Sequence, residues 1–167
     1  ALAVLAQRES YGVRDARAVL CAASAHLRRG NAPAAETLYR SALAAEPRSG
    51  DAHRGLGMAM VAQRRFGEAA ACFRQAHAQA PADARNLQML GLCLLELADP
   101  GAAEPILRQS LDLDDASSVS WRYLAAALDR QDRGDEALAA WERATRLEDA
   151  AAEGESFVPL AVALTNQ

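Results

Sequence analysis

Lysine is missing from this chain of 167 residues, so all 18 of its basic side chains are arginines. The 22 acidic side chains outnumber them, and the formal net charge of -4 argues against a general nucleic-acid-binding surface. Aromatic residues make up only 5% of the chain, so a core would have to form by close approach of helices rather than by packing of large rings. The composition, with 51% hydrophobic residues, is that of a globular protein.

Long apolar stretches are also absent, because no part of the sequence approaches the roughly 18 residues that a membrane-spanning helix needs. The longest candidate, residues 89–95, is followed by the charged residues Glu96 and Asp99. We therefore expect no insertion into a membrane. The chain does not begin with methionine, and its opening ALAVLA resembles the end of a secretion signal without the basic leader. It is interpreted as a fragment or a processed chain, and its compartment is left open, with the cytoplasm favoured over the periplasm.

Motifs of catalysis and metal binding are absent as well. The sequence has no phosphate-binding loop, no GxSxG or HExxH motif and no clustered metal ligands. Its three cysteines, Cys21, Cys72 and Cys93, lack CxxC spacing and are interpreted as small buried hydrophobic residues rather than as a disulfide framework. These observations predict no enzymatic activity, no cofactor and no metal site.

What the chain does contain is a pattern that returns at a constant interval. In residues 50–81, apolar residues recur at three- and four-residue spacing in two segments joined by a polar turn, which predicts a pair of short helices. The same landmarks return in four units that begin at Ala16, Gly50, Ala84 and Ser118, without insertion or deletion. Because each short helix alone would be marginal in water, successive pairs are expected to stack on one another.

Equivalent positions of the four units hold residues of similar size. Midway along each predicted first helix lies a small residue: Ala23, Gly57, Gly91 or Ala125. Near the middle of each predicted second helix lies a bulky one: Tyr39, Phe73, Leu107 or Trp141. Small residues let helix backbones approach one another, and bulky ones fill the gaps between neighbouring pairs.

A constant period of about 34 residues with these landmarks resembles the tetratricopeptide repeat (TPR) family. Leu56 and Gly57 with Phe73 and Pro81 give one of the best matches. The resemblance implies an all-α fold, namely a right-handed superhelical solenoid of antiparallel helix hairpins with four repeats at 16–49, 50–83, 84–117 and 118–151. Residues 1–15 are then an N-terminal helix or the remnant of a preceding repeat.

Residues 152–167 are predicted to form a C-terminal capping helix, with Ser156 as its N-cap. Both sides of this segment are apolar, so docking on another element, a second copy or a partner is left open. Self-association through the terminal helices follows from the same observation.

The first helices of such a stack line one continuous concave wall. By helical spacing and by similarity to the family, the wall residues of the first unit are Arg17, Leu20, Ser24, Leu27 and Arg28, and the second unit adds Asp51 among others. The candidate peptide-binding groove consists of Arg54, Met58, Arg85, Gln88, Met89, Leu92, Leu95, Arg122, Tyr123 and Ala126.

This groove has an aliphatic, methionine-rich middle with arginines at its edges. Methionine adapts to apolar partners, and arginine can bind carboxylates through two hydrogen bonds. We therefore expect an apolar peptide that carries some acidic residues. Two alternatives stay open: Leu92 and Leu95 belong to the core, or the chain's own end fills the groove.

The leading hypothesis is a non-catalytic protein–protein interaction module or scaffold, chaperone-like and bacterial, that binds a protein or peptide and neither nucleic acid nor membrane. One alternative is a TPR segment that presents substrate within a larger enzyme, such as a glycosyltransferase or sulfotransferase. Another is similarity to the TPR chaperones of type III secretion translocators. The last is a structural protein that assembles through its two ends.

Overall fold

The computed structural model describes the backbone of residues 16–164 and the side chains of residues 16–150 and 152. A helix at residues 16–28 is followed by α2 (Ala32–Ala45), α3 (Gly50–Ala62), α4 (Phe66–Gln79), α5 (Ala84–Glu96), α6 (Pro100–Leu113), α7 (Ser118–Asp129) and α8 (Gly134–Leu164). The described residues contain no strand, and the predicted all-α class is confirmed.

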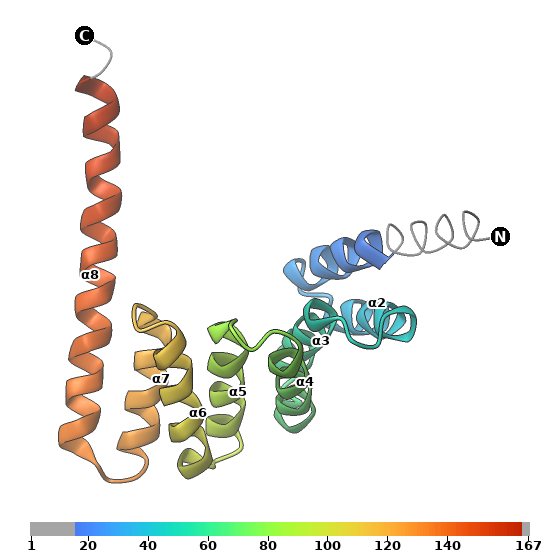
Figure 1. The fold of residues 1–167 in the computed structure, drawn as a ribbon, viewed down its shortest axis with the longest axis horizontal. Coiled ribbons are helices and arrows are strands. Elements are labelled where there is room, and N and C mark those ends of the chain that lie inside the picture. Colours follow the sequence, from blue (N-terminus) through green and yellow to red (C-terminus); the bar gives the residue numbers. More distant parts are fainter. Residues whose placement is uncertain (1–15, 165–167) are drawn as a thin grey trace.

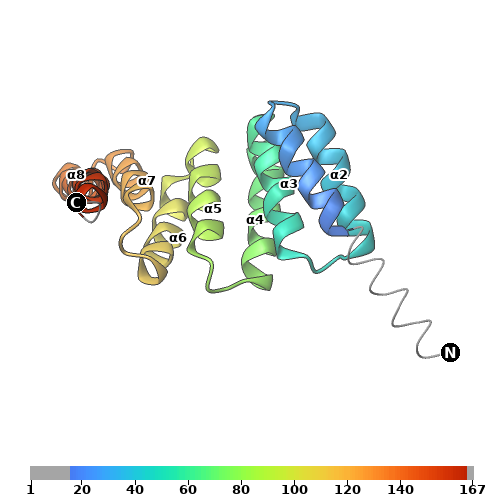
Figure 2. The same ribbon diagram turned by 90° about the horizontal axis from the view of Figure 1, so that it is seen from above.

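The helices form a row of pairs in which each element packs on its neighbours in the chain (Figure 1). Seen from above, the pairs follow one another along this row without closing into a bundle (Figure 2). Helices α3, α5 and α7 begin at Gly50, Ala84 and Ser118, the residues at which the second, third and fourth units are predicted to begin. The predicted solenoid is therefore confirmed. None of the helices in the described part of the chain has the length and hydropathy needed to cross a membrane.

Each first helix ends in the same left-handed turn. Gly30, Arg64, Ala98 and Asp132 have positive φ angles of 78, 60, 58 and 59°, and they occupy the same position in the four successive units. At the second turn, the Arg65 amide donates to the Met60 carbonyl at 3.0 Å, as in a Schellman motif. Only Gly30 adopts this conformation without the steric cost that a side chain adds.

Side chains that bond to the backbone fix the starts of the helices. Ser49 accepts the Ala52 amide at 3.3 Å, Asp99 accepts the Ala102 amide at 3.0 Å, and Ser117 accepts the Ser120 amide at 3.2 Å. These N-caps satisfy amides that the first turn of a helix leaves without partners.

The core follows the small and bulky positions of the repeat. Phe73 and Leu107 are 0% exposed, and both lie over glycines of the preceding helix, Gly57 and Gly91. A β-carbon at Gly91 would lie 2.4 Å from Leu107 Cδ2, so the close approach of α5 and α6 depends on glycine there.

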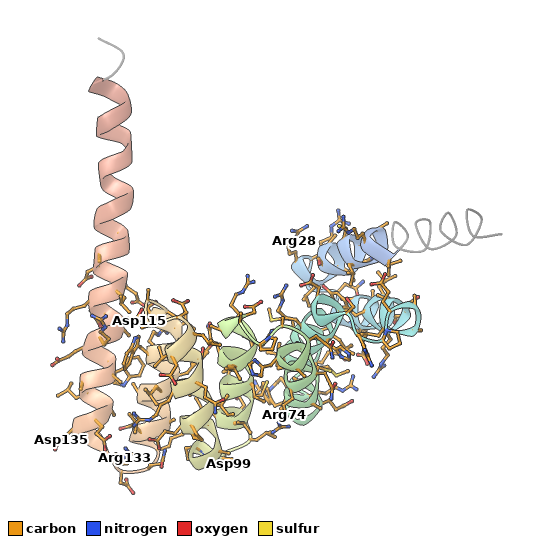
Figure 3. The ribbon with its side chains drawn as sticks, in the orientation of Figure 1. Arg28, Arg74, Asp99, Asp115, Arg133 and Asp135 are labelled. Atoms are coloured by element: carbon orange, nitrogen blue, oxygen red, sulfur yellow. The ribbon has the colours of Figure 1, made fainter. Side chains whose placement is uncertain are left out.

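A polar cluster, which we call the glutamate network, recurs at an interval of two repeats. Glu36 of α2 accepts a hydrogen bond from Gln63 at 2.7 Å and another from Arg65 at 2.9 Å. Two repeats later, Glu104 of α6 accepts the equivalent bonds from Gln131 at 3.1 Å and from Arg133 at 2.7 Å (Figure 3 labels Arg133). The network joins the first repeat to the second and the third to the fourth. Ala70 occupies the equivalent position between the second and third repeats.

The C-terminal end differs from the sequence-based prediction. The structure has one helix of 31 residues, α8, in place of a second helix that ends near Asp149 and a separate capping helix over 152–167. Its C-terminal half extends beyond α7 instead of folding back over the repeats (Figure 1). The physical reason is that residues 147–153, LEDAAAE, consist mostly of good helix formers and contain neither glycine nor the proline that closes the first two units. The predicted helix in residues 1–15 lies outside the described residues.

Candidate functional site

The structure places the predicted groove residues on three successive first helices. Arg54 and Met58 are on α3, the five residues from Arg85 to Leu95 are on α5, and the remaining three are on α7. Met58 is 40% exposed, which is high for a large apolar side chain. The half-buried members are Arg54, Gln88, Met89, Leu92, Tyr123 and Ala126, and the exposed ones are Arg85 and Arg122.

Leu95 does not line a surface, which corrects the prediction for this residue. It is 4% exposed and belongs to the hydrophobic core. The reason is that α7 packs directly against α5 at this level, where the Arg130 guanidinium donates to the Leu95 carbonyl at 2.5 Å. Leu92, for which the same alternative was open, keeps partial exposure.

A pocket of about 550 Å³ lies between the first and second repeats. It brings Arg54 and Met58 together with wall residues of the first repeat. Its lining is Leu20, Cys21, Ser24, Leu27, Arg28, Tyr39, Asp51, Arg54, Gly55 and Met58. The other eight residues of the predicted groove lie outside this pocket.

The base of this pocket is shaped by a close contact between Tyr39 and Gly55. A β-carbon at Gly55 would lie 2.2 Å from a ring carbon of Tyr39, so the ring occupies the space that a side chain would take. The Tyr39 hydroxyl is 3.0 Å from Ser24 Oγ, and Ser24 Oγ donates to the Leu20 carbonyl at 2.9 Å. The pocket therefore has an aromatic base, and both apolar and charged side chains surround it.

All three arginines of the predicted groove are already paired within the chain. Arg54 lies 2.6 Å from Asp51 and 2.6 Å from Asp83, and Arg85 lies 2.8 Å from Asp83. The hydrogen bonds from Arg85 hold the pKa of Asp83 below its ordinary value. Arg122 has a longer contact, 3.6 Å, with Glu148 of α8.

Besides Arg54, the pocket is lined by a second arginine, Arg28. It projects from the C-terminal end of the 16–28 helix (Figure 3), and no carboxylate of the described residues lies within ion-pair distance of it. A guanidinium at the edge of this pocket that has no carboxylate partner among the described residues favours an anionic group on the ligand.

Three of the lining residues, Cys21, Tyr39 and Gly55, were missed by the sequence-based prediction. Cys21 and Gly55 are equivalent positions of successive first helices, and Tyr39 was assigned to the bulky core position. Their role follows from a contact between repeats, and the period alone does not show which side chains face each other across that contact.

The thiols differ in environment, and this corrects the interpretation of all three cysteines as buried. Cys21 is exposed at the pocket, Cys72 is half-buried and Cys93 is 0% exposed. Burial raises the pKa of the Cys93 thiol to about 12 and raises that of Cys72 as well. Within the described residues, no group of His, Cys, Asp and Glu is placed to hold a metal ion.

We expect iodoacetamide at about pH 8 to alkylate Cys21 first, Cys72 slowly, and Cys93 only after unfolding, because the thiolate is the reacting form. Peptide mass spectrometry over a time course measures the three rates. Alkylation of Cys93 as fast as that of Cys21 in the native protein would contradict the packing of α5.

Comparisons with known proteins are consistent with this architecture. Residues 20–84 match a family model described as tetratricopeptide repeat. The chain is 26% identical over 139 residues to BBSome complex member BBS4 from Bos taurus. That match covers 83% of this chain but only 27% of the relative, so the chain spans about a quarter of its length.

Solved structures with the same fold include MamA and YrrB. A crystal structure of MamA has a TM-score of 0.77 at 17% identity and covers 83% of this chain and 81% of that one. MamA from Desulfovibrio magneticus RS-1 has a TM-score of 0.75 at 21% identity, with 81% and 76% covered. YrrB, described as a TPR protein with an unusual peptide-binding site, has a TM-score of 0.72 at 23% identity, with 90% and 76% covered.

Proposed function

We propose, for a chain that is built of tetratricopeptide repeats, that it is a non-catalytic scaffold whose first two repeats bind a segment of a partner protein. TPR proteins are in general protein–protein interaction modules, and the fold described above is of this kind. The observation that carries this proposal is the pocket of about 550 Å³, which combines apolar side chains with Arg28, an arginine that has no carboxylate partner among the described residues.

The pocket supports a ligand with an apolar side chain beside an acidic one. Leu20, Leu27 and Met58 offer the apolar contact, and Met58 can adapt to different side chains. Arg28 supplies the positive charge for the acidic group. This refines the prediction from sequence, because the arginines first assigned to that role, Arg54 and Arg85, are held by Asp51 and Asp83.

The test is selection of binding peptides from a random library on the immobilised protein, followed by fluorescence anisotropy with the selected peptide. We expect selected sequences to combine a large apolar residue with Asp or Glu. Arg28→Glu and Met58→Glu should each weaken binding by about tenfold or more, which corresponds to about 1.4 kcal/mol.

Two matched controls separate the pocket from general surface effects. Arg29→Glu makes the same charge change at an exposed neighbour that does not line the pocket, and Leu113→Glu replaces an apolar side chain that is 46% exposed on α6. Both should bind within about twofold of the unsubstituted chain. Equal loss in Arg28→Glu and Arg29→Glu would show that only net charge matters, and would refute the proposed site.

Three other functions are suggested by the sequence, and each can be tested. A substrate-presenting role in a larger enzyme would require a catalytic domain on the same polypeptide, which the full-length gene reveals directly. A type III secretion translocator chaperone would bind apolar translocator segments, which direct binding measurements with such segments would detect. Self-association through residues 1–15 and 152–167 concerns side chains that lie almost wholly outside the described ones.

A further inference from the structure

The outer face of α8 exposes two large apolar side chains, and at the position of one of them, Trp141, every earlier repeat has a buried residue. Leu138 is 60% exposed and Trp141 is 42% exposed. The residues equivalent to Trp141 in the earlier repeats, which are Tyr39, Phe73 and Leu107, are 4%, 0% and 0% exposed. We call Leu138 and Trp141 the tail surface.

The opposite end of the row shows the complementary difference. On the 16–28 helix, Ala18, Cys21 and Ala22 are exposed. The residues equivalent to Ala22 in later repeats, which are Leu56, Leu90 and Leu124, are at most 7% exposed, because the second helix of the preceding repeat covers them. We call Ala18, Cys21 and Ala22 the head surface.

These two surfaces are the two sides of the contact that each repeat makes with the next. Between the first and second repeats, Tyr39 of α2 lies against Gly55 of α3. Counted from repeat to repeat, Tyr39 corresponds to Trp141 and Gly55 corresponds to Cys21. A β-carbon at Gly55 would lie 2.2 Å from the Tyr39 ring, so Cys21 and Trp141 cannot copy this contact atom for atom.

The later repeats hold Met89 and Tyr123 at the position of Gly55, so a side chain at this place is compatible with stacking of repeats. We propose that the tail surface of one copy of this chain binds the head surface of a second copy, in the order in which one repeat follows the next.

The polar groups at the two ends agree with this assignment. Where the glutamate network joins two repeats, a buried glutamate on one side meets an arginine on the other, as for Glu36 and Arg65. At the ends of the chain, the position of the glutamate is taken by Leu138 and that of the arginine by Asn31. Both partners of the ion pair are replaced together, so neither is left without the other at the junction. The position of Gln63 is taken by Arg29, whose side chain is exposed.

The contact is heterologous, because it joins two different surfaces. Each added copy therefore leaves one tail surface and one head surface free, and repeated contacts produce an open fibre or a closed ring. The head surface shares Cys21 with the pocket between the first two repeats, so the association would cover one edge of that pocket. It would continue the concave wall from one copy to the next.

Sedimentation velocity over about a hundredfold range of concentration tests this proposal, since the mass of an associating protein rises with concentration. We expect the unsubstituted chain to form dimers and larger species. The double variant Leu138→Asp and Trp141→Asp should remain monomeric, and so should Ala22→Asp on the head surface. Leu113→Asp, at an exposed site on α6, should associate as the unsubstituted chain does.

Three outcomes would overturn the proposal: a monomer at every concentration, association that the tail variant does not weaken, or loss of folding in Ala22→Asp. The last would show that the chain's own residues cover the head surface. Circular dichroism of each variant separates loss of folding from loss of association.

A cross-link gives a second, positional test. With Trp141→Cys, a short thiol–thiol cross-linker should join native Cys21 of one copy to the substituted position of another and give a ladder of dimers, trimers and larger products. Leu113→Cys should give no such ladder. If both variants give the same products, the head and tail surfaces do not meet.

Discussion

Replacing Gly91 by alanine is expected to lower the free energy of unfolding by about 1–3 kcal/mol, the usual cost of overpacking. The new β-carbon would lie 2.4 Å from Cδ2 and 2.5 Å from Cγ of Leu107. Leu107 is 0% exposed, so the added β-carbon must displace either its buried side chain or the helices α5 and α6 themselves. Urea denaturation followed by circular dichroism measures the change.

The same substitution at Gly67 is the matched control. Gly67 lies in α4, and a β-carbon there would meet nothing within 4 Å. Alanine is the better helix former by about 0.5–1 kcal/mol, so Gly67→Ala should stabilise the protein. If Gly91→Ala also stabilised it, the close packing of α5 on α6 would be wrong.

A second variant tests whether Leu107 is the source of the cost. In the double variant Gly91→Ala with Leu107→Ala, the added β-carbon enters the space that the shortened side chain leaves. We expect the double variant to lose less stability than the sum of the two single variants, because the two residues are in direct contact.

The second large effect is expected from Glu104→Gln. The Glu104 carboxylate accepts hydrogen bonds from Arg108 at 2.8 Å, from Gln131 at 3.1 Å and from Arg133 at 2.7 Å, and its side chain is only 15% exposed. Hydrogen bonds to charged groups contribute about 1.5–3 kcal/mol each, so loss of the charge should cost about that much at pH 7.

This cost should depend on pH in a defined direction. Burial alone would raise the pKa of Glu104, but the bonds from Arg108, Arg133 and Gln131 outweigh it and hold the pKa at about 2, against 4.5 for a free glutamate. A lowered pKa means that the charge stabilises the fold above about pH 4.5 and loses this effect as the pH falls toward about 2. The difference between Glu104→Gln and the unsubstituted chain should therefore shrink across this range.

Urea denaturation of both proteins at about pH 7 and about pH 3 measures the difference. Glu142→Gln is the control, because the contact of Glu142 with Arg146 is 3.4 Å long and joins two exposed side chains. Such surface pairs contribute about 0–1 kcal/mol. An equal loss in both variants, or a loss that is the same at both pH values, would contradict the role of the glutamate network.

The period of the repeat was sufficient to predict most of the architecture. Helices start where the units were predicted to start, because small, bulky and capping residues return at fixed positions that local rules of helix formation and packing can interpret. The glycine at Gly91 and the bulky residue at Leu107 pair as those positions predict. Local pattern and packing agree in this part of the chain.

The errors have two physical sources. Leu95 was misplaced because neighbouring residues of a helix differ by about 100° in direction, and only the contact with α7 decides which of them is covered. Asp83 lies 29 residues from Arg54, so the sequence could not show that this carboxylate already holds the arginine assigned to a ligand. The pocket likewise depends on a contact between repeats, that of Tyr39 with Gly55.

The most direct test of the central claim is a nitrogen–proton NMR titration of the labelled protein with the peptide selected on it. The account predicts that the largest shifts come from amides of the 16–28 helix and of α3 around Gly55 and Met58, and that Arg28→Glu reduces them. Shifts concentrated on the outer faces of α4 and α6, with the residues around the pocket unchanged, would contradict it.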